Sequence, residues 1–215
     1  MSEMMSEEIT PDLETVIDFG EELNTSPRIA IFASGSGSNF EALALACASG
    51  EVEAEVAIMV CDKPKAYVVE RAAKLGIKSL VLSPKDFASK ADYEQTILDK
   101  LNEEKVEVIC LAGYMRILGS TLLNAYPDRI MNVHPSLLPA FKGAHAIEQA
   151  LAYGVKWFGV TIHLVNEELD SGAVLDQAAF RYEGNKVEEL EQMVHAAEHP
   201  LYIATLQRFL TEINE

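Results

Sequence analysis

The sequence is poor in several features that would assign it to a whole class of proteins. It holds three cysteines in 215 residues, with no C-x-x-C spacing and no histidine cluster beside them, so it indicates neither a disulfide framework nor a zinc site. No apolar stretch approaches the ~20 residues needed to span a bilayer, and the first residues lack the basic start and apolar middle of a signal peptide. A cytoplasmic location is therefore expected.

Basic residues are also scarce. The chain has 17 Lys and Arg against 34 Asp and Glu, for a formal net charge of -17. This excess of negative charge disfavours nucleic acid or an anionic membrane surface as the main partner, so an anionic ligand would have to be held by local donors. None of the five histidines forms a ligand pattern with another histidine, a cysteine or a carboxylate at the usual spacings, and no metal is expected.

The chain consists of two regions that differ in charge composition. Residues 1–26 hold eight acidic residues and no Lys or Arg. Within them, Thr10-Pro11 has the pattern of an N-cap followed by proline at the first helical position, and apolar residues recur at helical spacing after it. This segment is either an amphipathic helix docked on the body or a solvated acidic tail. Residues 27–215 are expected to form a single domain.

From Arg28 onward, apolar stretches typical of strands alternate with segments of helical spacing. The expected strands cover residues 28–33, 53–60, 77–82, 106–112 and 129–133, and the expected helices cover 39–48, 66–75 and 93–104. Two more strands, at 158–165 and 173–180, and a long helix at 187–209 follow. The alternation predicts an α/β fold with a doubly wound, mostly parallel twisted sheet, helices on both faces and ligands at the carboxyl ends of the strands.

Asn132 and His134 lie two residues apart where an expected strand gives way to a loop. Alternate residues of an extended chain share a face, so the carboxamide and the imidazole should point into one small volume. Such a pair can hold a developing oxyanion and move a proton, which is chemistry for acyl transfer. An isolated N-x-H pattern is more often a loop cap and a pocket-filling histidine.

A loop of small residues, Ser34–Asn39, connects the first expected strand to the first expected helix. Glycine allows a tight turn there, and backbone N–H groups at a helix start can cradle an anion such as phosphate. Phe40 stands where a dinucleotide fingerprint requires a third glycine, and the P-loop lysine is missing, so a nicotinamide cofactor is disfavoured. The alternative is a loop that merely turns the chain.

Two further segments should lie at the same edge of the sheet. The run Gly113–Leu118 follows the fourth expected strand, and its Met and aliphatic groups either wall a slot for a flat heterocycle or form ordinary core. Asp170 lies in a turn-prone segment and could approach His134 to favour its imidazolium form. The catalytic proton is assigned to none of the remaining histidines, which are His145, His163, His195 and His199.

Together these segments closely resemble the phosphoribosylglycinamide formyltransferases, a family of folate-dependent enzymes that formylate glycinamide ribonucleotide in purine synthesis. The resemblance spans about residues 28–210. The run N-V-H-P-S-L-L-P at 132–139 is shared with other users of 10-formyltetrahydrofolate, and the glycine-serine loop narrows the resemblance to this family.

The resemblance implies a role for each motif residue. The catalytic trio would be Asn132, His134 and Asp170. The residues that bind glycinamide ribonucleotide would be Gly37, Ser38, Asn39 and Glu198. The folate would be bound by Lys90, Met115, Arg116, Ile117, Leu118 and Asn132.

The sequence departs from the family pattern at two places. Lys90 stands where the family often has arginine. The lysine keeps the positive charge but lacks the planar fork of the arginine guanidinium. Phe141-Lys142-Gly143 replaces a version of this loop with proline before the glycine. That difference is expected to loosen the loop without touching the catalytic trio.

The implied activity is transfer of the formyl group from 10-formyltetrahydrofolate, a co-substrate, to the amine of glycinamide ribonucleotide. A monomer or homodimer acting on small molecules is expected. Alternatives are a formyltetrahydrofolate hydrolase, a methionyl-tRNA formyltransferase and a non-catalytic folate- or nucleotide-binding module. The first two predict an extra domain before or after the catalytic part, the acidic balance disfavours tRNA, and the intact trio disfavours the binding module.

Overall fold

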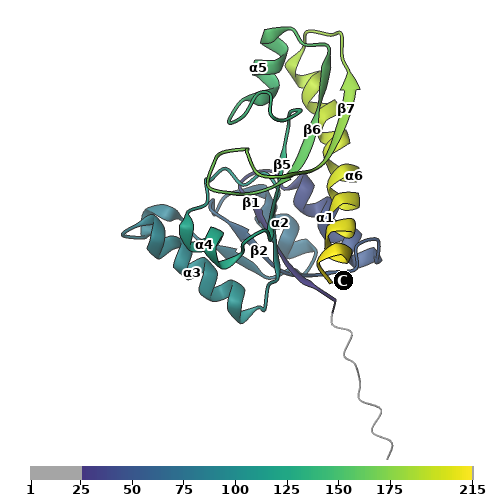
Figure 1. The fold of residues 1–215 in the computed structure, drawn as a ribbon. Helices are drawn as coiled ribbons and strands as arrows, with labels where there is room; N and C mark the ends of the chain where they lie inside the picture. Colours follow the sequence, from purple (N-terminus) through teal and green to yellow (C-terminus); the bar gives the residue numbers. More distant parts are fainter. Residues whose placement is uncertain (1–25, 215) are drawn as a thin grey trace, which may run out of the picture.

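The computed structural model describes residues 26–214, and the helix expected after Thr10 lies outside them. One seven-stranded sheet carries helices on both faces (Figure 1). The strands are β1 Arg28–Ala33, β2 Glu55–Cys61, β3 Ser79–Val81, β4 Val108–Leu111, β5 Ile130–His134, β6 Trp157–Leu164 and β7 Val174–Arg181. The helices are α1 Ser38–Ser49, α2 Tyr67–Lys74, α3 Lys90–Glu103, α4 Ser120–Ala125, α5 Ala146–Tyr153 and α6 Val187–Asn214, with a 3-10 turn at Pro84–Asp86.

The sheet has the order β3-β2-β1-β4-β5-β6-β7. Strands β1 to β5 pair in parallel, and β6 runs antiparallel to both β5 and β7. The chain winds outward from β1 to β3 and then crosses back to β4, so the loops after β1 and β4 meet where the winding reverses. Sheets of this kind bind ligands at that point. The predicted doubly wound, mostly parallel α/β class is confirmed.

Alternating side chains of the strands build two cores, one on each face of the sheet. Ile29 and Ile31 of β1 belong to the core formed with α1, α2, α5 and α6, whereas Ala30 and Phe32 belong to the core formed with α3 and α4. All four side chains are fully buried, which explains why β1 is apolar throughout rather than alternating. The hydroxyl of the buried Tyr202 in α6 donates to the carbonyl oxygens of Leu111, at the end of β4, and Met131, in β5. These bonds tie α6 to the sheet beneath the site.

Helices α4 and α5 were not predicted from the sequence. They contain six and eight residues, and α4 is too short for two full turns of apolar periodicity. Helix α6 also runs past the predicted end at residue 209, and it continues through Pro200. Within residues 26–214, no helix combines the length and apolar character that a membrane crossing requires.

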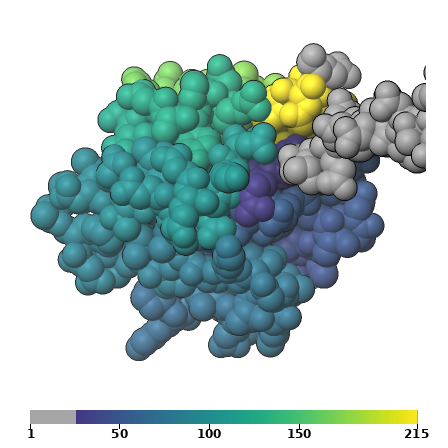
Figure 2. All heavy atoms as spheres, turned by 90° about the horizontal axis from the view of Figure 1, so that it is seen from below, coloured from purple at the N-terminus to yellow at the C-terminus, as the bar shows by residue number. Residues whose placement is uncertain are grey.

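The amino end of the sheet carries a cavity of about 640 Å³. Figure 2 views this end, where the start of β1 (purple) lies beside the end of α6 (yellow). Among residues 26–214, its lining includes Pro27, Val52 and Leu210, no histidine, and one carboxylate, that of Glu53. It therefore lacks the groups for acyl transfer, which lie at the opposite end of the sheet.

Candidate active site

Strand β5 presents Asn132 and His134 on one face of the sheet, as the alternation predicted. Met131 and Val133 point into the core beneath α1 and α6, so the two polar side chains point to the α3 and α4 side. His134 is 5% exposed, and Asn132 is half-buried. A buried imidazole must be hydrogen-bonded or paired, so its neighbours determine what it can do.

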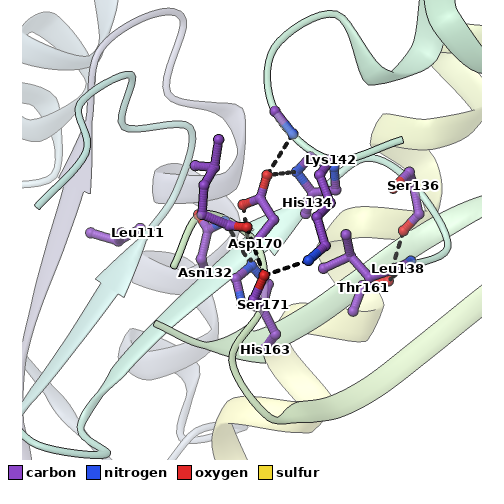
Figure 3. A network of polar contacts seen from close by, with 12 residues as sticks. Leu111, Asn132, His134, Ser136, Leu138, Lys142, Thr161, His163, Asp170 and Ser171 are labelled. Carbon is purple, nitrogen blue, oxygen red and sulfur yellow. Dashed lines mark hydrogen bonds and ion pairs between the residues drawn. The ribbon is translucent and has the colours of Figure 1, made fainter. Parts of the chain in front are cut away.

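Both ring nitrogens of His134 face oxygen acceptors (Figure 3). Nε2 donates to the carbonyl oxygen of Phe141 at 2.9 Å, and Nδ1 lies 3.5 Å from Asp170 Oδ2. Carbonyl and carboxylate oxygens only accept, and the imidazolium is the form of histidine that donates from both nitrogens. The Phe141 carbonyl and the Asp170 carboxylate therefore fix the orientation of the His134 ring.

Asp170 reaches His134 from the loop between β6 and β7. Its backbone has φ 49°, a left-handed turn conformation that aspartate adopts more readily than most residues. The backbone N–H of Gly143 donates to Oδ2 at 2.7 Å, and this bond fixes the carboxylate beside the ring. Gly172 lets the loop close onto β6, because a Cβ there would lie 1.8 Å from the carbonyl oxygen of Leu164. The expected approach of Asp170 to His134 is present.

His163, to which the sequence analysis assigned no catalytic proton, lies directly beside Asn132 and Asp170 (Figure 3). Nδ1 donates to the carbonyl oxygen of Leu164 at 2.8 Å, so Nε2 is left to accept from Asn132 Nδ2 at 3.1 Å. Burial, the largest cause, lowers the pKa of His163 below its ordinary value near 6.5. A neutral His163 thereby orients the Asn132 amide and leaves its second hydrogen for a ligand.

The pKa of His163 leads to a prediction about stability. Burial also lowers the pKa of His199, so in the folded chain both rings resist protonation near pH 6.5. The unfolded chain takes up these protons, and the free energy of unfolding is therefore expected to fall as the pH drops from about 7.5 to about 5.5. Urea denaturation at the two pH values measures this, and His163→Gln should reduce the difference. Equal stability at both values would contradict it.

The loop that follows His134 is held by the fully buried Thr161 of β6. Thr161 Oγ1 donates to the carbonyl oxygen of Ser136 at 2.7 Å and accepts from the backbone N–H of Leu138 at 3.0 Å. These bonds fix the path of the chain from His134 to Phe141, whose carbonyl oxygen then meets the His134 ring. This anchor was not predicted, because a threonine within an apolar strand carries no distinguishing sequence pattern.

Residues 141–143, where the loop departs from the family pattern, contact two members of the catalytic trio. Phe141 bonds His134 through its carbonyl oxygen, and Gly143 bonds Asp170 through its N–H. Between them, the Lys142 ammonium contacts the Ser171 hydroxyl in the loop that carries Asp170. The segment touches the trio through backbone atoms, whose positions residue types alone do not reveal.

The glycine-serine loop, Ser34–Asn39, ends at the start of α1. Gly37 has φ 77°, and a Cβ there would lie 2.5 Å from Val68 Cγ2. Ser38 and Asn39 begin the helix, where free N–H groups and the helix dipole attract anions. Asn39 Nδ2 donates to Glu198 Oε2 at 2.8 Å, so α1 and α6 together assemble the four residues expected to bind the ribonucleotide.

Gly37→Ala tests this loop. An alanine at this position would have to adopt the left-handed backbone conformation of Gly37, which costs ~1–2 kcal/mol. Its Cβ would also collide with the Val68 side chain. We expect weaker binding of glycinamide ribonucleotide, with KM raised about ten-fold or more for such a loss. Gly35→Ala is the matched control, because no atom lies within 4 Å of its added Cβ. Equal KM values for the two variants would show that Gly37 has no special role.

A second cavity, of about 420 Å³, lies beside the loop that follows β4. We call it the β4 cavity. Met115 and Ile117 are 72% and 65% exposed, a degree unusual for large apolar side chains and typical of a ligand site. The cavity lining includes all five folate residues outside β5 that the resemblance implied, namely Lys90, Met115, Arg116, Ile117 and Leu118.

The β4 cavity and the glycine-serine loop are directly connected. Ser34 Oγ accepts from the N–H of Met115 at 2.9 Å, and the N–H of Ser34 donates to the carbonyl oxygen of Gly113 at 3.1 Å. The site therefore has a helix start with free N–H groups, a partly apolar cavity, and an Asn-His-Asp cluster formed by β5 and the β6–β7 loop. No group of three or more His, Cys, Asp or Glu side chains in residues 26–214 could hold a metal ion.

This fold and site are those of a known class. Residues 27–206 match the formyl transferase family, and the chain belongs to that family. It is 45% identical over 184 residues to the phosphoribosylglycinamide formyltransferase of Bacillus subtilis (strain 168), a match that covers 85% of this chain and 94% of that protein. It is also 41% identical over 175 residues to the trifunctional purine biosynthetic protein adenosine-3 of Drosophila melanogaster, covering 80% of this chain but only 13% of that longer protein.

Solved structures give the same result. Glycinamide ribonucleotide transformylase 1 from Geobacillus kaustophilus superposes with a TM-score of 0.84 at 48% identity, over 86% of this chain and 99% of that chain. Phosphoribosylglycinamide formyltransferase from Brucella melitensis superposes with a TM-score of 0.82 at 44% identity, over 86% and 96%. The chain therefore shares the fold of these enzymes across nearly their whole length.

Proposed function

We propose that the protein transfers the formyl group of 10-formyltetrahydrofolate to the amine of glycinamide ribonucleotide. The observation that carries this proposal is the cluster of Asn132 and His134 at the end of β5 with Asp170 from the β6–β7 loop, on the strand next to β4 and its cavity. The identity to phosphoribosylglycinamide formyltransferases over most of the chain supports the choice of substrates.

Each substrate has a region of suitable chemistry. The start of α1 offers backbone N–H groups to a phosphate, and the buried Glu198 carboxylate offers an acceptor to the glycinamide part. The β4 cavity combines exposed apolar side chains with the cationic groups of Lys90 and Arg116, which suits a flat ring with an anionic tail. Binding the two substrates side by side would place the amine near the formyl carbon.

In the proposed reaction, the amine attacks the formyl carbon and forms a tetrahedral intermediate with a negative oxygen. The free amide hydrogen of Asn132 donates to that oxygen, and the positive charge of the protonated His134 ring stabilises it electrostatically. Asp170 keeps His134 charged and, directly or through water, helps to carry a proton from the attacking nitrogen to the leaving N10. Collapse of the intermediate leaves the formyl group on the ribonucleotide and releases tetrahydrofolate.

The direct test is consumption of a 10-formyl folate analogue, followed by its absorbance, with and without glycinamide ribonucleotide. We expect a rate that requires the ribonucleotide. An equal rate without it would identify water as the acceptor and the protein as a hydrolase. Tight binding of the analogue with no reaction under either condition would favour a non-catalytic binding module.

A further inference from the structure

An ion pair between Asp62 and Arg116 crosses the carboxyl edge of the sheet. Asp62 directly follows β2, Arg116 lies in the loop after β4, and β1 stands between these two strands. Arg116 Nε donates to Asp62 Oδ2 at 2.8 Å. The pair therefore passes over the end of β1, the point from which the glycine-serine loop leaves the sheet.

Stability does not account for this aspartate. Its side chain is 1% exposed, and its other oxygen, Oδ1, has no hydrogen-bond partner among residues 26–214. A carboxylate taken out of water and left with one unpaired oxygen carries a desolvation penalty that a single partly exposed partner does not offset. An apolar residue of similar size would be at least as favourable at this position, so the charge calls for another explanation.

The charge of Asp62 determines how Arg116 is held. The Arg116 side chain is 45% exposed and lines the β4 cavity together with Lys90, so without a partner it could adopt many rotamers. Asp62 binds Nε and leaves Nη1 and Nη2 with no hydrogen bond inside the described part of the chain. Two free, coplanar N–H groups form the fork that matches a carboxylate.

The backbone of this loop is anchored independently of Asp62. Ser34 Oγ accepts from the N–H of Met115, and Glu94 Oε1 accepts from the N–H of Gly119 at 2.7 Å. These bonds lie on either side of Arg116 and would persist if Asp62 were changed. A change at Asp62 should therefore alter the orientation of one side chain rather than the path of the loop.

We propose that Asp62 is a positioning residue that holds the Arg116 guanidinium toward the anionic tail of the formyl donor. This role rests on the proposed function, because it requires a folate with carboxylates to occupy the β4 cavity. Asp62 does not touch the reacting atoms, so it should act on binding of the donor rather than on the chemical step.

Asp62→Asn and Asp62→Leu test the role, with Asp128→Asn as the charge-matched control on an exposed residue before β5. Loss of a charged partner weakens a hydrogen bond, so we expect KM for the 10-formyl folate to rise about ten-fold in both Asp62 variants. The KM for glycinamide ribonucleotide, kcat and Tm should stay within the range of the control. Arg116→Lys, which lacks the fork, should raise the same KM.

Two results would overturn the proposal. One is an unchanged KM for the folate in Asp62→Leu. The other is a fall in both Tm and kcat together with a rise in the KM of both substrates, which would indicate a structural role. If the wild type shows no ribonucleotide-dependent transfer, the proposed function fails separately. Calorimetric titration with a non-reactive 10-formyl folate analogue then decides the inference: weaker binding by the Asp62 variants than by Asp128→Asn supports it, and equal binding contradicts it.

Discussion

Replacing His134 by alanine is expected to lower kcat by about 10²–10⁴-fold, the range over which a positioned acid-base group contributes. The variant loses the ring whose two nitrogens face Phe141 and Asp170, and with it the charge and the proton beside the reacting carbon. Stopped-flow measurement of formyl transfer at saturating concentrations of both substrates gives kcat directly. Binding of the ribonucleotide at the start of α1 should be nearly unchanged, because His134 lies at the end of β5 and not in the glycine-serine loop.

His145→Ala is the control for this substitution. The His145 side chain is 78% exposed and pairs only with Glu148 within residues 26–214, so its loss should leave kcat near the wild-type value. If His134→Ala kept a kcat close to that of His145→Ala, the role given to His134 would be wrong.

Asp170→Asn is expected to cause the second large loss, about 10²-fold or more in kcat. The asparagine keeps the shape of the side chain, and its amide oxygen can still accept from the N–H of Gly143. It removes the negative charge beside His134, so the imidazolium loses the partner that favours it. The loss should appear in kcat and kcat/KM together, since the charge acts on the intermediate more than on the bound substrates.

Glu168→Asn is the comparison for Asp170, since Glu168 lies in the same loop and its side chain is 79% exposed. The comparison variant should keep near wild-type kcat, and both proteins should show wild-type Tm. A kcat for Asp170→Asn within a few-fold of the comparison variant would refute the electrostatic role.

Much of this site follows from local rules that the sequence obeys. Asn132 and His134 share a face because a strand alternates, and Gly37 marks the turn into α1 because only glycine avoids both the strain and Val68 there. The parallel sheet then brings the ends of β1, β4 and β5 to one edge. The alternation of strand and helix patterns predicted the fold class, and the resemblance to the formyltransferase family assigned the roles of the candidate residues.

The parts that were missed depend on contacts between distant segments. His163 meets Asn132 only because β6 pairs antiparallel with β5 in one particular register. Gly143 and Phe141 contribute backbone atoms, and Asp62 acts across an intervening strand, so their residue types carry little signal. Register and loop path are set by the whole tertiary structure, which a single sequence does not display.

The most direct test of the central claim is to identify the product that receives the formyl group. A 10-formyl folate with an isotopic label in its formyl carbon would be incubated with the protein and glycinamide ribonucleotide, and the products separated by mass spectrometry. We predict that the label appears on the ribonucleotide with the wild type and is reduced by about 10²-fold or more with His134→Ala. Label recovered as formate, or equal transfer by the two proteins, would contradict formyl transfer by the site at the end of β5.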